Sequence, residues 1–194
     1  MGRLNLVKRL DLLLEAIGRA RKEIDNLVFL IAGPDWGELN SLKARVHQLG
    51  MDQEVQFLGP VSPERRNALM AAADFLTLTS HEESFGYSAV EAMFCGLPVI
   101  VTEGVGISQV VQQEEAGEVV SLEPQSISQA MLRLAQDRDL RQEMGRNASR
   151  GARRHFDIAE VCRKMALAYE DILLGRRSPE LSWSDQPIQT VSGS

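Results

Sequence analysis

The chain has 194 residues, of which 44% are apolar and 25% charged, and this composition is typical of one globular domain. A net charge of −6 argues against nucleic acid as the main partner, and no apolar run approaches the roughly 20 residues that cross a bilayer. The start does not resemble a signal peptide, and Cys95 and Cys162 lie far apart without metal-binding spacing. We therefore expect a cytoplasmic protein with reduced thiols and no metal site.

Short apolar runs, several rich in β-branched residues, predict five buried strands of a parallel sheet. They span residues 26–32, 54–57, 75–78, 98–102 and 118–120. Helical patterns separate these runs and dominate the end of the chain. They span residues 10–22, 37–49, 63–73, 87–94 and most of 126–174. The alternation predicts an α/β fold, a Rossmann-like doubly wound parallel sheet with a helical C-terminus.

The two ends of the chain suggest how this domain is bounded. Gly2, Arg3 and Leu4 are of the kind that ends a strand and opens a loop, yet only Met1 precedes them. We therefore expect that a strand is missing or that the chain was cut from a longer protein. Residues 175–194 are rich in Ser, Pro and Gln, so we expect a domain at 1–174 and a disordered tail at 175–194.

The segment with the most chemistry runs from residue 80 to residue 99, where a strand ends and a helix begins. Ligands of open α/β sheets bind at the carboxyl ends of the strands, and Glu83 falls in a loop at such an end. Gly86 allows a close approach of the backbone, and the free N–H groups of Gly86, Tyr87 and Ser88 could hold an anion. The alternative is that Glu83 binds no ligand and caps the helix.

Glu91 lies about one helical turn further on, on a face that can still reach the crevice. If its carboxylate is buried among apolar neighbours it needs a partner, and sugar hydroxyls would serve. The alternative is a solvated surface glutamate. The complete string, with Glu83 and Glu91 separated by seven residues and followed by Gly96-Leu97-Pro98-Val99, is a long ordered pattern that favours a binding site.

This string resembles the E-x7-E signature of the retaining glycosyltransferases of family 4, the group 1 glycosyl transferases of GT-B fold. Further motifs of that family resemble segments found in the same order along residues 2 to about 169. They are Gly2-Arg3-Leu4 with Lys8, Ala32-Gly33-Pro34, Val55-Gln56-Phe57-Leu58-Gly59 and Ala72-Ala73-Asp74. The resemblance implies the GT-B C-terminal domain, the half that binds the nucleotide sugar.

The resemblance also implies roles for positions that bind the nucleotide. Arg3 and Lys8 match the basic pair that binds the donor diphosphate, and fixed cations would stabilise the negative charge of that leaving group. Glu91 matches the glutamate that binds the ribose hydroxyls. Leu58 matches the position whose backbone meets the base.

For the sugar, the resemblance implies that Glu83 contacts the donor hexose as the candidate catalytic residue. Phe85, Gly86 and Tyr87 match the loop that faces sugar and phosphate. The activity implied is retaining transfer of a hexose from a UDP- or GDP-sugar, with no cofactor and no obligatory metal. The acceptor would be held by an N-terminal domain or subunit. One departure is Arg9, which replaces the usual glycine after Lys8 and could set that loop differently.

The sequence leaves other functions, and a second role for its arginines, to be considered. The chain could be a non-catalytic nucleotide-sugar-binding module or an inactive fragment, because the same residues would serve both. A dinucleotide oxidoreductase is disfavoured because no Gly-x-Gly-x-x-Gly follows a strand, and a sugar-nucleotide epimerase because epimerases of similar fold lack the E-x7-E string. Finally, seven arginines between residues 133 and 164 form either a solvated helical face or a surface attracted to anionic lipid or to an acidic partner. Attraction to lipid would make the protein peripheral to a membrane.

Overall fold

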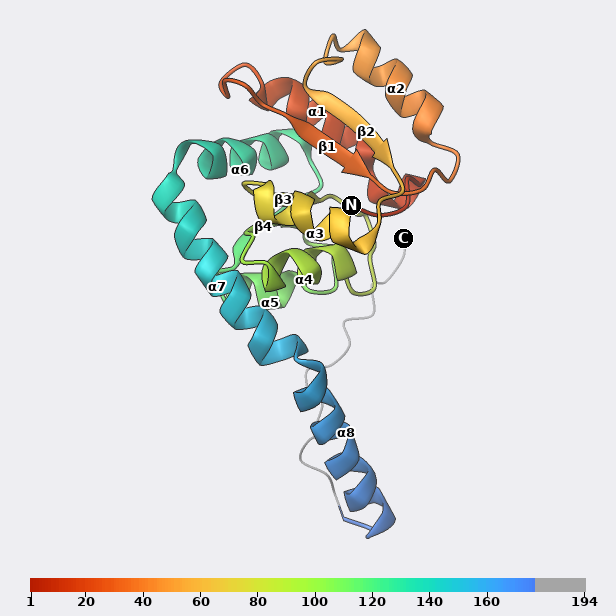
Figure 1. The fold of residues 1–194 in the computed structure, drawn as a ribbon, viewed down its shortest axis with the longest axis vertical. Helices are drawn as coiled ribbons and strands as arrows, with labels where there is room; N and C mark the ends of the chain where they lie inside the picture. Colours follow the sequence, from red (N-terminus) through yellow and green to blue (C-terminus); the bar gives the residue numbers. More distant parts are fainter. Residues whose placement is uncertain (177–194) are drawn as a thin grey trace, which may run out of the picture. The chain divides into compact units, whose positions relative to one another are not determined.

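The computed structural model describes residues 1–176 of the chain (Figure 1). The chain divides into two compact units, Met1–His155 and a second one that begins at Phe156. The predicted domain end at residue 174 stays a prediction, and the predicted tail lies almost wholly outside the described residues. The fold below is that of the first unit, except where α8 is named.

All five predicted strands are present, and each pairs in parallel with a neighbour, as in the predicted α/β fold. They are β1 (Phe29–Ala32), β2 (Val55–Gly59), β3 (Leu76–Leu78), β4 (Val99–Thr102) and β5 (Gly117–Val120). The described strands form two ladders, β1–β2 and β3–β4–β5, whereas the sequence predicted one sheet. β4 is buried at every position because it lies in the centre of its ladder and is covered on both faces.

Residues 2–8 connect the two ladders at their carboxyl ends. Gly2 N donates to Ala32 O at 2.9 Å and Leu4 N donates to Pro34 O at 2.9 Å, just beyond β1. The 3-10 helix η1 (Leu6–Lys8) then reaches the loop after β3, where His81 N donates to Val7 O at 2.9 Å. The segment that carries Arg3 and Lys8 is therefore fixed between both ladders by backbone hydrogen bonds.

The helices lie where the apolar patterns placed them, with ends shifted by a few residues. They are α1 (Leu10–Ala20), α2 (Leu39–Gln48), α3 (Pro63–Ala72), α4 (Tyr87–Phe94), α6 (Pro124–Gln136), α7 (Arg138–Phe156) and α8 (Ile158–Leu173). A short helix, α5 (Ser108–Gln113), was not among the predicted segments. The long helical ending is broken at Asp137 and Asp157, and the carboxylate of Asp157 caps α8 by accepting from Ala159 N and Glu160 N.

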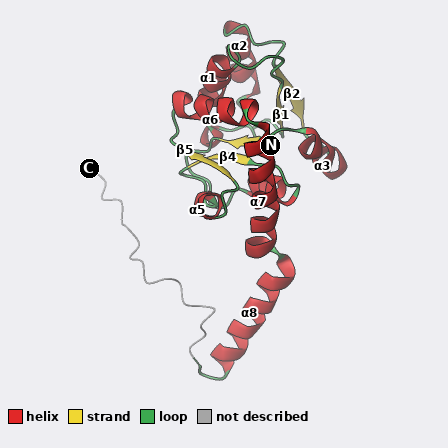
Figure 2. Ribbon diagram, turned by 90° about the vertical axis from the view of Figure 1, so that its left-hand side faces the viewer, coloured by secondary structure: helices red, strands yellow, loops and turns green. Residues whose placement is uncertain are grey.

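The apolar core is shared by both ladders and the helices that cover them (Figure 2). Leu14 and Ile17 of α1 pack with Ile127 and Met131 of α6, and none of these side chains is more than 1% exposed. Ile100 of β4 belongs to the same cluster. Figure 1 shows α6 on one side of the β3–β4–β5 ladder and α4 with α5 on the other. The helices therefore cover both faces of the β3–β4–β5 ladder and leave the carboxyl ends of its strands open.

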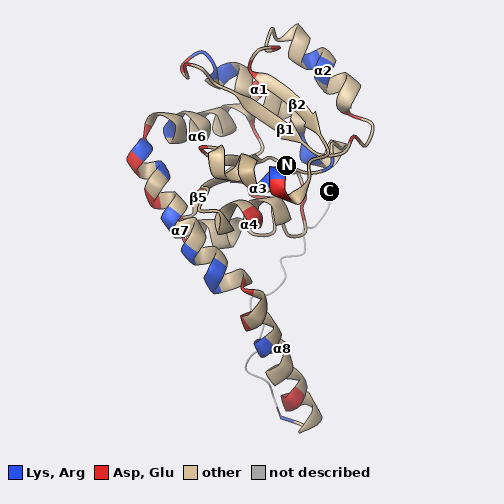
Figure 3. Cartoon of the chain, viewed as in Figure 1, with Lys and Arg blue, Asp and Glu red and all other residues tan. Residues whose placement is uncertain are grey.

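The arginine-rich region forms much of α7 (Figure 3), and several of its charges are already paired. Arg133 pairs with Glu118, Arg141 with Asp74 and Arg154 with Glu114. In the second unit, Arg163 pairs with Glu160. This pairing favours the solvated helical face over a lipid-binding surface. Within residues 1–176, no helix combines the length and the apolarity that crossing a membrane requires.

Candidate functional site

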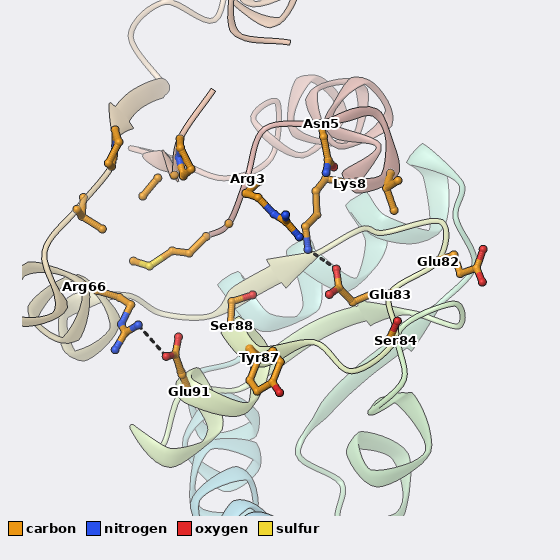
Figure 4. A pocket seen from close by; sticks show the side chains of 18 residues that line it. Arg3, Asn5, Lys8, Arg66, Glu82, Glu83, Ser84, Tyr87, Ser88 and Glu91 are labelled. Atoms are coloured by element: carbon orange, nitrogen blue, oxygen red, sulfur yellow. Dashed lines mark hydrogen bonds and ion pairs between the residues drawn. The ribbon is translucent and has the colours of Figure 1, made fainter. Parts of the chain in front are cut away.

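A cavity of about 620 Å³ opens at the carboxyl ends of the strands, where the fold predicts a ligand site. Its walls come from residues 1–8, the loops after β1, β2 and β3, and the first turns of α3 and α4. Arg3, Lys8, Glu83, Tyr87 and Glu91 all line it. Five of the eight residues predicted from sequence are therefore brought together. In Figure 4, Lys8 and Glu83 lie at one end of the cavity, and Arg66 and Glu91 lie at the other.

Arg3 is exposed and is held by an aromatic ring that the sequence did not single out. Its guanidinium carbon lies 4.4 Å from the centroid of the Trp36 ring, within the range of a cation–π contact. The loop that carries Trp36 is fixed by Asp35, whose Oδ1 accepts from the backbone N–H groups of Gly37, Glu38 and Leu39. These bonds, that of Leu39 first, lower the pKa of Asp35. The Arg3 cation is thus supported by an ordered loop.

Lys8 and Glu83 form an ion pair at their end of the cavity, although 75 positions separate them in the chain. Ser80 Oγ also donates to Glu83 Oε2, at 3.3 Å. Thr79 Oγ1 donates to Lys8 O at 3.0 Å, which ties η1 to the end of β3. Because their side chains are 16% and 23% exposed, Lys8 and Glu83 are partly shielded but open to a ligand.

The loop that carries Glu83 is supported by the loop after β4. Glu83 N donates to Gly104 O at 2.9 Å, and Gly106 N donates back to Glu83 O at 2.8 Å. A Cβ atom on Gly106 would lie 2.2 Å from Ser84 O, so only glycine permits this contact. Sequence reasoning missed Gly104 and Gly106, because their importance comes from the loop that they touch and not from a ligand.

The N-terminus of α4 faces the cavity through Tyr87 and Ser88. Gly86 is its N-cap and has φ 103°, a left-handed conformation that favours glycine. The Phe85 ring packs against Tyr87, with centroids 4.8 Å apart. Phe85 and Gly86 do not line the cavity, so they hold the loop and the helix start behind it. Their predicted contact with sugar and phosphate stays a prediction.

Glu91 is less buried than the sequence suggested. Its side chain is 38% exposed, and its partner is an arginine that was not predicted: Arg66 Nη1 lies 2.7 Å from Glu91 Oε1. The carboxylate therefore lies between the buried and the solvated alternatives, because α4 presents Glu91 at the rim of the cavity. Its predicted contact with ribose stays a prediction.

Leu58 lies in β2 and does not line the cavity, whereas Pro60 and Val61 on the following loop do. Its predicted backbone contact with a base stays a prediction. Among residues 1–176, no group of three or more His, Cys, Asp or Glu side chains could hold a metal ion. Arg9, where the family has glycine, adopts the left-handed conformation φ 44°, ψ 44° that glycine readily takes. The expectation that Arg9 sets this loop differently stays a prediction.

The chain is similar in sequence to known glycosyltransferases. The family model of the group 1 glycosyl transferases matches residues 1–151. The D-inositol 3-phosphate glycosyltransferase of Corynebacterium kroppenstedtii is 31% identical over 93% of this chain and 41% of its own length. The N-acetyl-alpha-D-glucosaminyl L-malate synthase of Bacillus anthracis is 28% identical over 86% of this chain and 43% of its own length. The chain thus spans about two fifths of the length of these curated relatives.

Two solved structures are similar to the chain in fold. HepE of Anabaena, in complex with UDP and glucose, matches with a TM-score of 0.79 and 25% identity, over 88% of this chain and 47% of its own. The C-terminal domain of the group 1 glycosyl transferase LpcC of Francisella tularensis matches with a TM-score of 0.75 and 24% identity. That match covers 81% of this chain and 84% of the LpcC domain. The chain therefore belongs to the group 1 glycosyl transferases and has the fold of their GT-B C-terminal domain.

Proposed function

We propose that this chain is the donor-binding half of a retaining hexosyltransferase. It would bind a nucleoside diphosphate sugar and pass the hexose to an acceptor held by an N-terminal domain. The observation that carries the proposal is the convergence of two cations, Arg3 and Lys8, and two carboxylates, Glu83 and Glu91, on one cavity at the carboxyl ends of parallel strands. Support comes from HepE, which shares the fold and was solved with UDP and glucose.

Arg3 and Lys8 would act on the leaving group. When the bond between the anomeric carbon and the diphosphate oxygen breaks, the electron pair stays on the diphosphate and its negative charge grows. Cations that are already fixed in place stabilise such charge by about 3 kcal/mol for one well-placed donor. Trp36 contacts the Arg3 guanidinium, and the Thr79 hydroxyl fixes the backbone of Lys8, before any ligand arrives.

Glu83 would act on the sugar as the candidate catalytic residue. Its carboxylate is anchored through Oε2 by Lys8 and Ser80. That arrangement leaves acceptor capacity on the other oxygen for hydroxyls of the hexose, since a carboxylate offers about four lone-pair sites. The contact between Lys8 and Glu83 would also join the sugar end of the ligand to its diphosphate end.

The test is calorimetric titration of the chain with UDP, GDP and ADP and with their glucose and mannose conjugates. We expect saturable binding of one nucleotide series. Lys8→Met should weaken the diphosphate by at least about tenfold, as for loss of a charge-assisted hydrogen bond, and leave the bare nucleoside unaffected. Lys43→Met, which removes an exposed lysine of α2, is the matched control. A folded chain that binds none of these ligands at millimolar concentration would refute the proposal.

A second candidate is a non-catalytic nucleotide-sugar-binding module or an inactive fragment. The same residues of the cavity would serve it, because Arg3, Lys8, Glu83 and Glu91 could bind a nucleotide sugar whether or not the hexose is transferred. Adding an acceptor domain separates the two functions, because only the transferase half then gives turnover. Retention is tested by the anomeric configuration of the product, read by NMR. The cytoplasmic location stays a prediction.

A further inference from the structure

We infer that Arg66 is a positioning residue for the nucleoside end of the site, which fixes the carboxylate of Glu91 for the two ribose hydroxyls. This inference rests on the proposed function and deepens it. It adds to the site a residue of α3, a helix from which the sequence predicted no contribution. The inference is carried by the ion pair at the cavity rim and by the way in which α3 is fixed.

The position of Arg66 is set by the start of its helix. Ser62 caps α3 by accepting from Arg65 N at 3.3 Å, and Arg66 N donates to Ser62 O at 2.9 Å. Because the loop 60–62 connects β2 directly to α3, the first turn of α3 lies at the same edge of the sheet as the cavity. Arg66 lines the cavity together with Pro60 and Val61, which the chain places just before it.

The Arg66 side chain is committed to one carboxylate. Its Nη1 lies 2.7 Å from Glu91 Oε1, and this is its one ion pair within residues 1–176. Lys8 is paired in the same way with Glu83. Each of these two carboxylates therefore has its own cation, one pair at each end of the cavity (Figure 4). The pairing separates a sugar end at Glu83 from a nucleoside end at Glu91.

The physical reason for an arginine here is preorganisation. The Glu91 side chain is 38% exposed, so without a partner it would sample several rotamers and would have to be ordered when a ligand binds. An ion pair with the nitrogen and oxygen 2.7 Å apart favours one orientation of the carboxylate. Since Arg66 contacts Oε1, Oε2 stays available to accept from a hydroxyl, and each carboxylate oxygen has two lone pairs.

Other roles of Arg66 would change nucleotide affinity in a different way when Arg66 is removed, so the inference can be tested. If Arg66 only neutralised Glu91 and competed with the ribose, its removal would free the carboxylate and strengthen nucleotide binding. If Arg66 contacted the base or phosphate directly, its removal would weaken all nucleotides, whether or not they carry ribose hydroxyls. Only positioning through Glu91 makes the loss depend on those hydroxyls.

The experiment is calorimetry with UDP and with 2′,3′-dideoxy-UDP on wild type and Arg66→Met; if wild type prefers another base, the corresponding pair is used. We expect Arg66→Met to weaken UDP about tenfold, the size of a typical coupling between contacting groups, and the dideoxy analogue by no more than about twofold. In the Glu91→Gln background the Arg66→Met effect should vanish. Arg66→Lys, which keeps a cation without the planar fork, should lie between wild type and Arg66→Met.

Arg65→Met is the matched control, because Arg65 is the exposed neighbour on the same helix and lies outside the cavity lining. Thermal unfolding of both variants shows whether α3 is intact. The inference would be overturned if folded Arg66→Met weakened both ligands equally, left binding unchanged or bound UDP more tightly. Any of these results would leave the proposed function standing. Failure of wild type to bind any nucleotide would overturn the proposed function and this inference with it.

Discussion

Replacing Glu114 with glutamine should lower the free energy of unfolding by about 2 kcal/mol at neutral pH. Glu114 follows α5, and its side chain is only 7% exposed. Its Oε1 lies 2.9 Å from Arg154 Nη1 and 2.9 Å from His155 Nε2, both near the end of α7. A hydrogen bond to a charged group contributes about 1.5–3 kcal/mol. We count mainly the His155 bond, because the Arg154 side chain is 61% exposed and screened by solvent.

The same contacts give the substitution a pH dependence of known sign. The hydrogen bond with His155 first, and then the charge of Arg154, lower the pKa of Glu114 below its ordinary value. The folded pKa therefore lies below the unfolded pKa. The stabilisation is fully present above the unfolded value, about 4.3, and is lost as the pH falls through the folded value. The difference between wild type and Glu114→Gln should thus be largest above about pH 5 and shrink in more acidic solution.

The assay is urea unfolding followed by far-UV circular dichroism, at neutral pH and at several acidic values. Glu115→Gln is the matched control, because the neighbouring Glu115 side chain is exposed and should change stability by less than about 0.5 kcal/mol. A difference between wild type and Glu114→Gln that stays constant with pH would refute the electrostatic reasoning. Equal effects of the two substitutions would refute the assigned contacts as well.

Three further substitutions test the loops around the site by the same unfolding assay. Arg9→Gly should stabilise the chain by about 0.5–1 kcal/mol, since it relieves a left-handed non-glycine residue; destabilisation would show that the exposed pair with Asp11 matters more. Gly86→Ala should cost about 2–3 kcal/mol, because φ is 103° and the new Cβ would lie 2.8 Å from Val105 Cγ1; a second change, Val105→Ala, should recover only the steric part. Ser62→Ala should cost about 1 kcal/mol through loss of the α3 cap, and no change would mean that water replaces it.

Much of the candidate site could be predicted because its parts lie at strand ends. Parallel strands place their carboxyl ends at one edge, so Glu83 in the loop after β3 could be expected at a ligand site, whereas Lys8 was expected there only from its resemblance to the family motif. The five strands were predicted from apolar runs as strands covered on both faces. β3 and β4 are buried throughout as expected, whereas β1, β2 and β5 are only partly buried. What the pattern did not predict is that these strands form two ladders, with residues 2–8 between their ends.

Other parts of the site depend on contacts that leave no mark in one sequence. Arg65 and Arg66 are adjacent and chemically identical, and only the turn of α3 decides which of them reaches Glu91. Trp36 is one of two tryptophans, and its contact with Arg3 follows from the bend that Asp35 imposes on the loop. Arg66 and Trp36 belong to the site because of the residues that they contact, Glu91 and Arg3. Those contacts are visible only in the structure.

Arg9 stands where the resembled motif has glycine, and its backbone adopts a left-handed conformation that glycine takes readily. The sequence suggested that losing glycine there would alter the loop after Lys8. Arg9 adopts φ 44°, ψ 44°, and its side chain pairs with Asp11. The neighbouring Lys8 contacts Glu83. This backbone conformation costs glycine little and arginine about 1–2 kcal/mol. If that is right, Arg9→Gly should change stability without changing nucleotide affinity, because the cost is confined to the turn.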